Sequence, residues 1–208
     1  LYLWKPKLNT MNPTIKNISI KYGSIFGALN VLYILYAYII DKTIFTMAGL
    51  WILIFFIGVG FYVFAISKVK QSQGGYATFK DVFSTYIISG VVAAAIGNGF
   101  TILLFVVIDP EFASEIMELT IDTTLDLLVK QMQNELAALE IDQDPSEIIK
   151  KYDEFQTRFM DWVDSKPFGI LGQLKSVAKS ITFNAVVGLI VAAAMKKNNP
   201  DELLRIKY

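Results

Sequence analysis

Five carboxylates between residues 111 and 126 recur at spacings of four, three, four and four residues. Successive residues of an α-helix turn by about 100°, so this spacing places all five on one face. Like charges so close together destabilise a helix by a few tenths of a kcal/mol per pair. A helix face that carries them despite this cost is suited to binding a cation or a basic partner. The alternative is an ordinary solvated face, favoured in part by the helix dipole. The residues are Glu111, Glu115, Glu118, Asp122 and Asp126.

Three asparagines, Asn30, Asn98 and Asn184, lie within long apolar runs. Amide side chains at membrane depth usually bond across helices, so we predict intramembrane polar contacts that hold helices together. The alternative is a polar path for a substrate or an ion. Such paths generally recruit ionisable residues, and these runs contain none.

The chain has neither Cys nor His among its 208 residues. Without Cys there are no disulfides or thiolate nucleophiles, and without His the commonest proton carrier and metal ligand at neutral pH is missing. No phosphate-binding loop or nucleotide motif is present, so we expect no enzyme activity, no cofactor and no metal site. The net charge is zero, with 19 basic and 19 acidic residues, and this balance gives no reason to expect a nucleic-acid partner.

The elements that position these residues are long apolar runs. Residues 82–108 carry no charge, and a helix of that length measures about 40 Å against a hydrocarbon core of about 30 Å. Such a helix spans a bilayer. Residues 43–67 form a second uncharged run, and residues 18–40 form another span with Lys21 near its start. Residues 170–195 combine an interfacial helix with a fourth span. The sequence therefore predicts an all-α integral membrane four-helix bundle.

Residues 109–169, between the third and fourth spans, are acidic and amphipathic. Asp109-Pro110 and Asp144-Pro145 each combine an N-cap with a proline that starts a helix. Each helix carries one apolar stripe at spacings of three and four, which favours an antiparallel helical hairpin outside the membrane with the stripes face to face. The stripes are Ile121, Leu125, Leu128, Met132, Leu136 and Leu139, and Ile148, Tyr152, Phe155, Phe159 and Trp162.

Small residues recur four apart within the first and third spans. Gly23 and Gly27 form a GxxxG pair, and Ser89, Ala93 and Gly97 share one face of the third span. Small residues let helix backbones approach closely, so we expect these positions, with Gly90, to mark helix packing inside one bundle. A dimerisation face is the alternative for Gly23 and Gly27.

Basic residues lie in the segment 1–17, in the loop 68–80 and in the tail 196–208, all on one side of a four-span topology. The positive-inside rule therefore predicts that both termini are cytoplasmic and that residues 109–169 lie on the opposite side. Met11 precedes a good helix start, so we expect either that the natural chain begins there or that the sequence was cut from a longer frame.

The stretch Gly74–Phe112 resembles the family catalogued as domain of unknown function 4199, which comprises four-span membrane proteins of Bacteroidota-type bacteria. The likeness depends on Gly75, Phe79 and Lys80 before the third span and on Asp109-Pro110 and Phe112 after it, and Gly23 and Gly27 fit as well. The resemblance implies a bacterial inner-membrane protein with an external insert between spans three and four, which makes the hairpin periplasmic. It implies no activity and no functional residues.

The function that these features favour is a non-catalytic structural or accessory component of the membrane. Its partners would be the lipid bilayer and, through the external hairpin, a membrane protein or a second copy of the chain. The alternative is a small transporter or channel with a polar path among spans one, three and four. A water-filled cavity lined by the three asparagines would favour transport, whereas a dry bundle would favour the accessory role.

Overall fold

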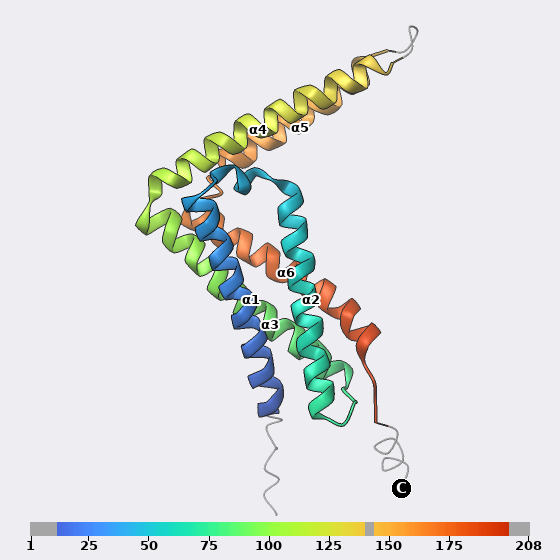
Figure 1. The fold of residues 1–208 in the computed structure, drawn as a ribbon. Helices are drawn as coiled ribbons and strands as arrows, with labels where there is room; N and C mark the ends of the chain where they lie inside the picture. Colours follow the sequence, from blue (N-terminus) through green and yellow to red (C-terminus); the bar gives the residue numbers. More distant parts are fainter. Residues whose placement is uncertain (1–11, 140–143, 200–208) are drawn as a thin grey trace, which may run out of the picture. The chain divides into compact units, whose positions relative to one another are not determined.

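The computed structural model describes residues 12–139 and 144–199, and most of the segments 1–17 and 196–208 lies outside these ranges. The described residues are all helical or irregular apart from one isolated β-bridge, which confirms the all-α prediction. In chain order the elements are α1 (Pro13–Ile39), the 3₁₀-helix η1 (Lys42–Thr46), α2 (Ala48–Ser72), α3 (Phe79–Leu103), the π-helix η2 (Leu104–Ile108), α4 (Pro110–Ala137), α5 (Ser146–Asp164) and α6 (Ile170–Met195) (Figure 1).

Among the described residues, four helices are long and apolar enough to cross a bilayer, namely Pro13–Ile39, Gly49–Ser72, Phe79–Ile108 and Ile170–Met195. The chain is a multi-pass membrane protein with four candidate spans. Large apolar side chains along these helices, such as Leu32, Ile57 and Ile190, stay exposed, as side chains that face lipid do.

The second span begins later and ends later than the sequence suggested. The Asp41 carboxylate accepts hydrogen bonds from the backbone N–H and the hydroxyl of Thr43, and these bonds fold Lys42–Thr46 into a 3₁₀ turn instead of the start of a long helix. They also hold the pKa of Asp41 below its usual value. At the other end α2 continues to Ser72, and the turn after it uses positive φ angles of 71° at Gly74 and 91° at Gly75.

Residues 170–195 form one continuous helix, α6, in which the predicted interfacial helix and the fourth span are not separated. Residues 165–169 separate α5 from α6, with Lys166 in the left-handed region at φ 50°. The backbone carbonyl of Lys166 accepts a hydrogen bond from the Gly169 N–H at 3.0 Å, which closes the turn that leads into α6.

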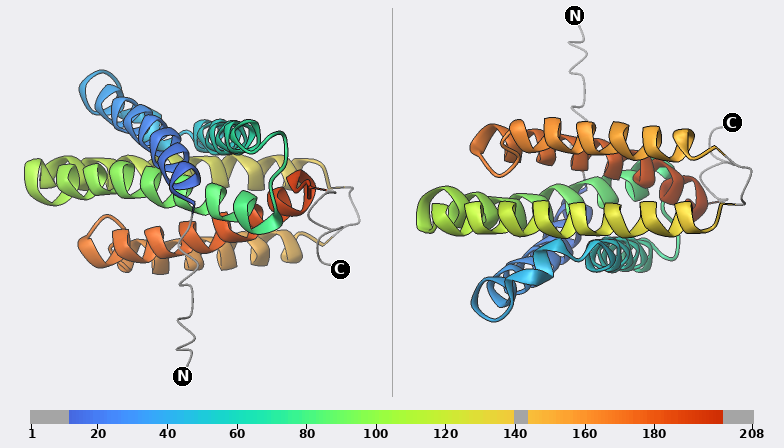
Figure 2. Two further views of the ribbon diagram at one scale, coloured as in Figure 1. Left: turned by 90° about the horizontal axis from the view of Figure 1, so that it is seen from below. Right: turned by 90° about the horizontal axis from the view of Figure 1, so that it is seen from above.

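The chain divides into two compact units. Unit 1 contains the described residues 12–31, 52–97 and 179–199, so it holds segments of all four candidate spans. Its core surrounds Tyr62 of α2 and Tyr86 of α3, and Ala192 of α6 is also fully enclosed. The two tyrosine rings meet edge to face with centroids 5.1 Å apart. Figure 2 gives two further views of these helices.

Glycines bring the helices of unit 1 close together. A Cβ atom on Gly23 would lie 2.6 Å from the Ser89 carbonyl oxygen, and one on Gly27 would lie 2.8 Å from the Ile96 Cβ, so α1 touches α3 at both positions. Beside Gly97 the nearest atom would be the Asn30 Cβ at 3.2 Å. Gly90 has looser surroundings, since its nearest neighbour, the Tyr62 ring, would be 3.8 Å away.

Unit 2 contains residues 32–51 and the described part of 98–178. Its core joins the end of α1, η2 and the first turns of α4 through Ile34, Leu104, Phe105, Phe112 and Ile116. Phe112 lies at its centre, with the rings of Tyr38, Phe45 and Phe105 at centroid distances of 4.7, 5.8 and 5.8 Å. The base of the α4–α5 hairpin is therefore built into this cluster.

Candidate functional site

The region between the third and fourth spans forms the predicted helical hairpin, with α4 and α5 running side by side (Figure 2). The start of α4 matches the prediction, because the Asp109 carboxylate accepts a hydrogen bond from the Phe112 N–H at 2.9 Å and Pro110 occupies the first position. At α5 the Asp144 carboxylate accepts bonds from the N–H and the hydroxyl of Ser146, which lower the pKa of Asp144.

The seam between the two helices has a polar connection that the sequence analysis missed. The Tyr152 side chain is buried, and its hydroxyl donates a hydrogen bond of 2.8 Å to the Glu135 carboxylate. The Lys151 ammonium donates to both oxygens of the same carboxylate at 2.8 and 2.9 Å. Hydrogen bonds from Lys151 and then Tyr152 lower the pKa of Glu135, and the bond to Glu135 raises the pKa of Lys151. The pair is thus charged at neutral pH.

The predicted seam is only partly correct. Leu125, Leu128, Met132 and Leu136 of α4 are half-buried as expected. On α5, however, Phe155 is 48% exposed and Trp162 is 39% exposed, although both were predicted to face α4. The apolar arc of α5 is too wide for a single partner helix to cover, so its margin remains open.

The open margin of α5 is a strip of aromatic residues. The rings of Phe159 and Trp162 stack with centroids 5.7 Å apart, and Trp162 meets Phe168 edge to face at 6.3 Å. Phe155 lies seven residues before Trp162, so both project from the same side of the helix. We refer to Phe155, Phe159 and Trp162 as the aromatic edge.

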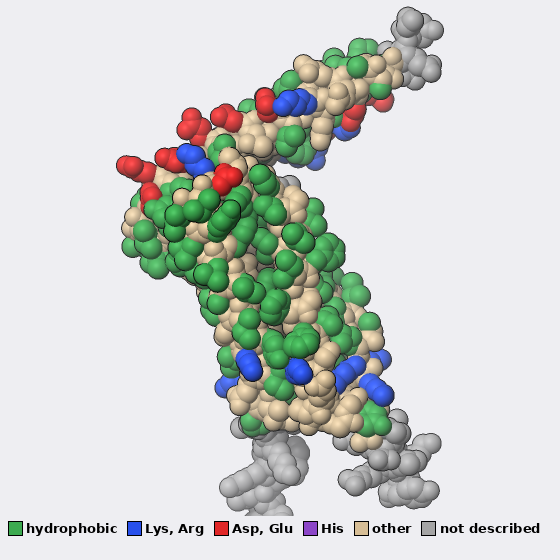
Figure 3. Space-filling model, viewed as in Figure 1, with side chains coloured by type: hydrophobic (Ala, Val, Ile, Leu, Met, Phe, Trp, Pro, Cys, Tyr) green, Lys and Arg blue, Asp and Glu red, His purple; other side chains and the backbone are tan. Residues whose placement is uncertain are grey.

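All five residues of the predicted acidic face are exposed on α4, and Figure 3 shows acidic side chains gathered over the hairpin. Two of them have basic partners: Glu115 pairs with Lys42 of η1 at 2.8 Å, and Asp126 pairs with Lys130 at 3.2 Å. Among residues 12–139 and 144–199, no three Asp or Glu side chains converge as metal ligands would. The face therefore offers separate surface charges and no assembled cation site.

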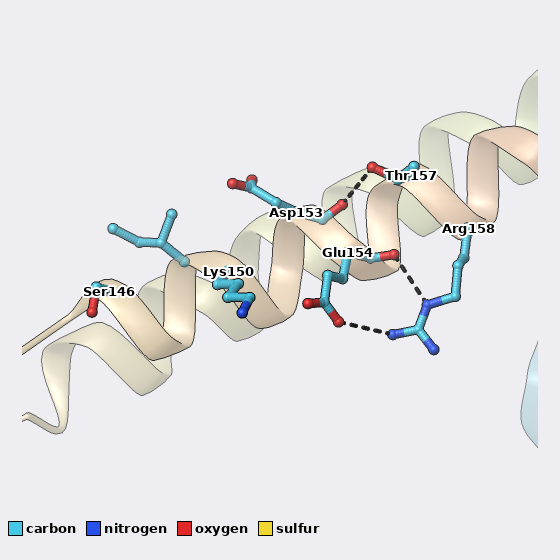
Figure 4. A pocket seen from close by; sticks show the side chains of 7 residues that line it. Ser146, Lys150, Asp153, Glu154, Thr157 and Arg158 are labelled. Atoms are coloured by element: carbon cyan, nitrogen blue, oxygen red, sulfur yellow. Dashed lines mark hydrogen bonds and ion pairs between the residues drawn. The ribbon is translucent and has the colours of Figure 1, made fainter.

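A shallow groove of about 570 Å³ follows one face of α5 (Figure 4). Its polar groups bond within the helix, where the Thr157 hydroxyl donates to the Asp153 carbonyl at 2.9 Å and Arg158 pairs with Glu154 at 3.5 Å. This arrangement gives an open polar surface and not a set of converging ligands. The lining residues are Ser146, Ile149, Lys150, Asp153, Glu154, Thr157 and Arg158.

Two of the three asparagines bond within their own helices, unlike the cross-helix contacts that we predicted. The Asn30 amide donates to the Phe26 carbonyl at 2.9 Å, and the Asn184 amide donates to the Ser180 carbonyl at 2.9 Å. Asn98 is half-buried in unit 2. The carbonyl of the residue four positions earlier lies closer to each amide than any group on a neighbouring helix. This explains why the amides bond within their own helices.

Serines make the polar contact between spans that was expected of the asparagines. The Ser89 hydroxyl of α3 donates to the Ser19 carbonyl of α1 at 3.1 Å, and both side chains are fully buried. The sequence contained part of this signal, since Ser89 belongs to the small-residue face of the third span. Nothing in the sequence identified Ser19 as its partner.

The α4 helix is anchored at its start by two further contacts that the sequence did not reveal. The Tyr38 hydroxyl donates to the Asp109 carboxylate at 3.0 Å, so this carboxylate caps α4 and binds the end of α1. The Lys42–Glu115 pair joins η1 to the second turn of α4. For the Lys42–Glu115 contact, the sequence offered only the opposite charges of Lys42 and of the acidic face as an indication.

Comparison with known proteins identifies a family for this chain. A search of curated proteins found no match, and a search of solved structures found none either. A family model described as protein of unknown function (DUF4199) matches residues 21–197, which include most of α1 and all of the other helices. Because the match covers most of the chain, from the first candidate span to the end of α6, the protein belongs to the DUF4199 family of proteins of unknown function.

Proposed function

We propose that the protein is a non-catalytic accessory component of the membrane and that the α4–α5 hairpin is its contact surface. The observation that carries the proposal is the aromatic edge. Phe155 and Trp162 keep 48% and 39% of their surface exposed in a segment that lies between two candidate spans and carries a dense acidic charge. Aromatic residues left open beside charged groups are typical of protein interfaces, where they become the buried centre of the contact.

The firm attachment of the hairpin supports the same role. The Phe112 cluster and the contacts of Asp109 and Glu115 hold the base of the hairpin. Farther along the hairpin, the Glu135–Lys151 ion pair joins α4 to α5. A rigid surface loses little entropy when it binds. The transporter alternative requires polar groups that are free to meet a substrate, and the amides of Asn30 and Asn184 already bond to their own helices.

A photo-crosslinking experiment tests the contact surface. We expect a benzophenone amino acid at Phe155 to form a specific adduct in intact cells with a membrane protein or with a second copy of the chain. The same label at Gln133, an exposed polar residue of α4, is the matched control and should give no adduct. Equal adducts from both positions, or none from Phe155, would show that the aromatic edge is not an interface.

We further propose that the protein resides in a bacterial inner membrane with both termini cytoplasmic and the hairpin periplasmic. The support is the distribution of charge. The described residues of unit 1 carry their lysines mainly where α1 and α3 begin and where α2 and α6 end, whereas the hairpin is acidic. Loops rich in Lys and Arg are retained in the cytoplasm.

Cysteine labelling tests this orientation, and the chain has no native Cys to interfere. A membrane-impermeant thiol reagent added to intact spheroplasts should label Gln133→Cys on the hairpin and should leave Asn198→Cys unlabelled until the cells are lysed. Both residues belong to the described part of the chain, and both Gln133 and Asn198 are exposed. Labelling of Asn198→Cys alone in intact spheroplasts would reverse the proposed orientation.

A further inference from the structure

The loop between α2 and α3 and the end of α6 bring four lysines together in unit 1. The Gly75 N–H donates to the Lys70 carbonyl at 2.8 Å, which folds the loop back onto the end of α2. Ala77 and Lys197 then exchange two backbone hydrogen bonds of 2.9 and 2.8 Å. Lys80 follows three residues after Ala77, at the second position of α3, and Lys196 precedes Lys197. We refer to Lys70, Lys80, Lys196 and Lys197 as the lysine cluster.

In the described part of unit 1, almost no acidic residue opposes the lysine cluster. In the described part of unit 1 the only acidic residue is Asp81. One oxygen of its carboxylate accepts hydrogen bonds from the N–H and the hydroxyl of Thr78, at 3.1 and 2.8 Å, and so caps α3. No ion pair involves any lysine of the cluster within residues 12–139 and 144–199. In the part of the chain that the structure describes, these four positive charges therefore have no carboxylate paired with them.

The cluster lies where three candidate spans end. Gly49–Ser72 and Ile170–Met195 finish beside it, and Phe79–Ile108 begins there. The ends of membrane helices lie at the level of the phospholipid headgroups. The Lys197 ammonium lies 5.2 Å from the centre of the Tyr76 ring, and aromatic rings at this depth anchor a protein at the interface. Figure 3 shows basic side chains gathered at this end of unit 1.

From this geometry we infer that the lysine cluster binds the phosphate headgroup of an anionic phospholipid. Juxtamembrane clusters of basic residues attract anionic lipids because each charge near the surface contributes binding free energy. The backbone pairing of Ala77 with Lys197 holds two of the lysine-bearing segments together before any lipid arrives, so little ordering is needed. This inference does not depend on the function of the hairpin, which lies in unit 2.

The test uses the full chain purified in a neutral detergent and titrated with phosphatidylglycerol or phosphatidylcholine, with bound lipid counted by native mass spectrometry. The parent should bind phosphatidylglycerol more tightly. The triple variant Lys70→Gln, Lys80→Gln, Lys197→Gln should lose about fivefold per charge, on the order of a hundredfold in apparent affinity. A control variant with Lys130→Gln, Lys150→Gln and Arg158→Gln removes the same charge from the hairpin and should bind as the parent does.

Several results would overturn the inference: equal affinity of the parent for the two lipids, unchanged binding by the triple variant, or an equal loss in the hairpin control. Displacement of the lipid by inorganic phosphate at the same concentration would assign the cluster to a free anion instead. If the triple variant does not fold, the salt dependence of lipid binding by the parent protein tests the inference. Its phosphatidylglycerol binding should weaken as salt is raised from about 0.05 to about 0.5 M, and binding that ignores salt would contradict a charged contact.

Discussion

Gly23→Leu is expected to abolish the packing of α1 on α3, with a loss of about 3 kcal/mol or more in the free energy of unfolding. A Cβ at position 23 would lie 2.6 Å from the Ser89 carbonyl oxygen and 3.0 Å from the Ser89 Cα. These are backbone atoms of a neighbouring helix, so they cannot turn aside as a side chain would. The same approach carries the Ser89 to Ser19 hydrogen bond, which would be lost together with the contact.

The measurement is the fraction of protein that stays monodisperse after heating in mild detergent. Gly60→Leu is the matched control, because nothing lies within 4 Å of a Cβ at Gly60 and the residue is exposed. It should melt near the parent temperature. Gly97→Leu should fall between the two, since the nearest atom there is the Asn30 side-chain Cβ at 3.2 Å. A parent-like melting temperature for Gly23→Leu would mean that α1 and α3 do not meet at this point.

Phe112→Ala is expected to loosen the base of the hairpin and to cost about 3–5 kcal/mol, the usual range for a buried aromatic truncated to Ala. Phe112 is 6% exposed, and three aromatic rings surround it. Its removal would leave a cavity that η1 and η2 cannot fill without giving up their own contacts. The cluster also holds Asp109 in place to cap α4, so the first turn of the hairpin should fray as well.

Protease sensitivity of the hairpin in membrane vesicles, with the hairpin side accessible, is the measurement. Cleavage within Pro110–Asp164 should be much faster in Phe112→Ala than in the parent. Phe56→Ala is the control, because Phe56 is 64% exposed on α2 and its truncation leaves no cavity. Phe112→Leu should lie closer to the parent. Equal protection of Phe112→Ala and the parent would contradict a structural role for the aromatic cluster.

The sequence by itself determined which segments are helical and where the two hairpin helices begin, although it placed both ends of α2 several residues too early. Apolar runs longer than a bilayer core is thick identified the four candidate spans, and Asp109-Pro110 and the Asp144–Ser146 region identified the starts of the two hairpin helices. These features depend on residues within a few positions of one another. The length, periodicity and capping of a helix can therefore be predicted from local sequence without knowledge of which helices pack against it.

Only the tertiary structure decided which side chains meet. The sequence pointed to Asn30 and Asn184 as the polar contacts between spans, whereas Ser19 and Ser89 make that contact and the amides bond to their own helices. It placed Phe155 inside the hairpin seam, and the structure leaves it 48% exposed. Periodicity specifies the face on which a residue lies. It does not specify the partner helix, how much of an apolar arc that partner covers, or whether a nearer carbonyl of the same helix satisfies a donor first.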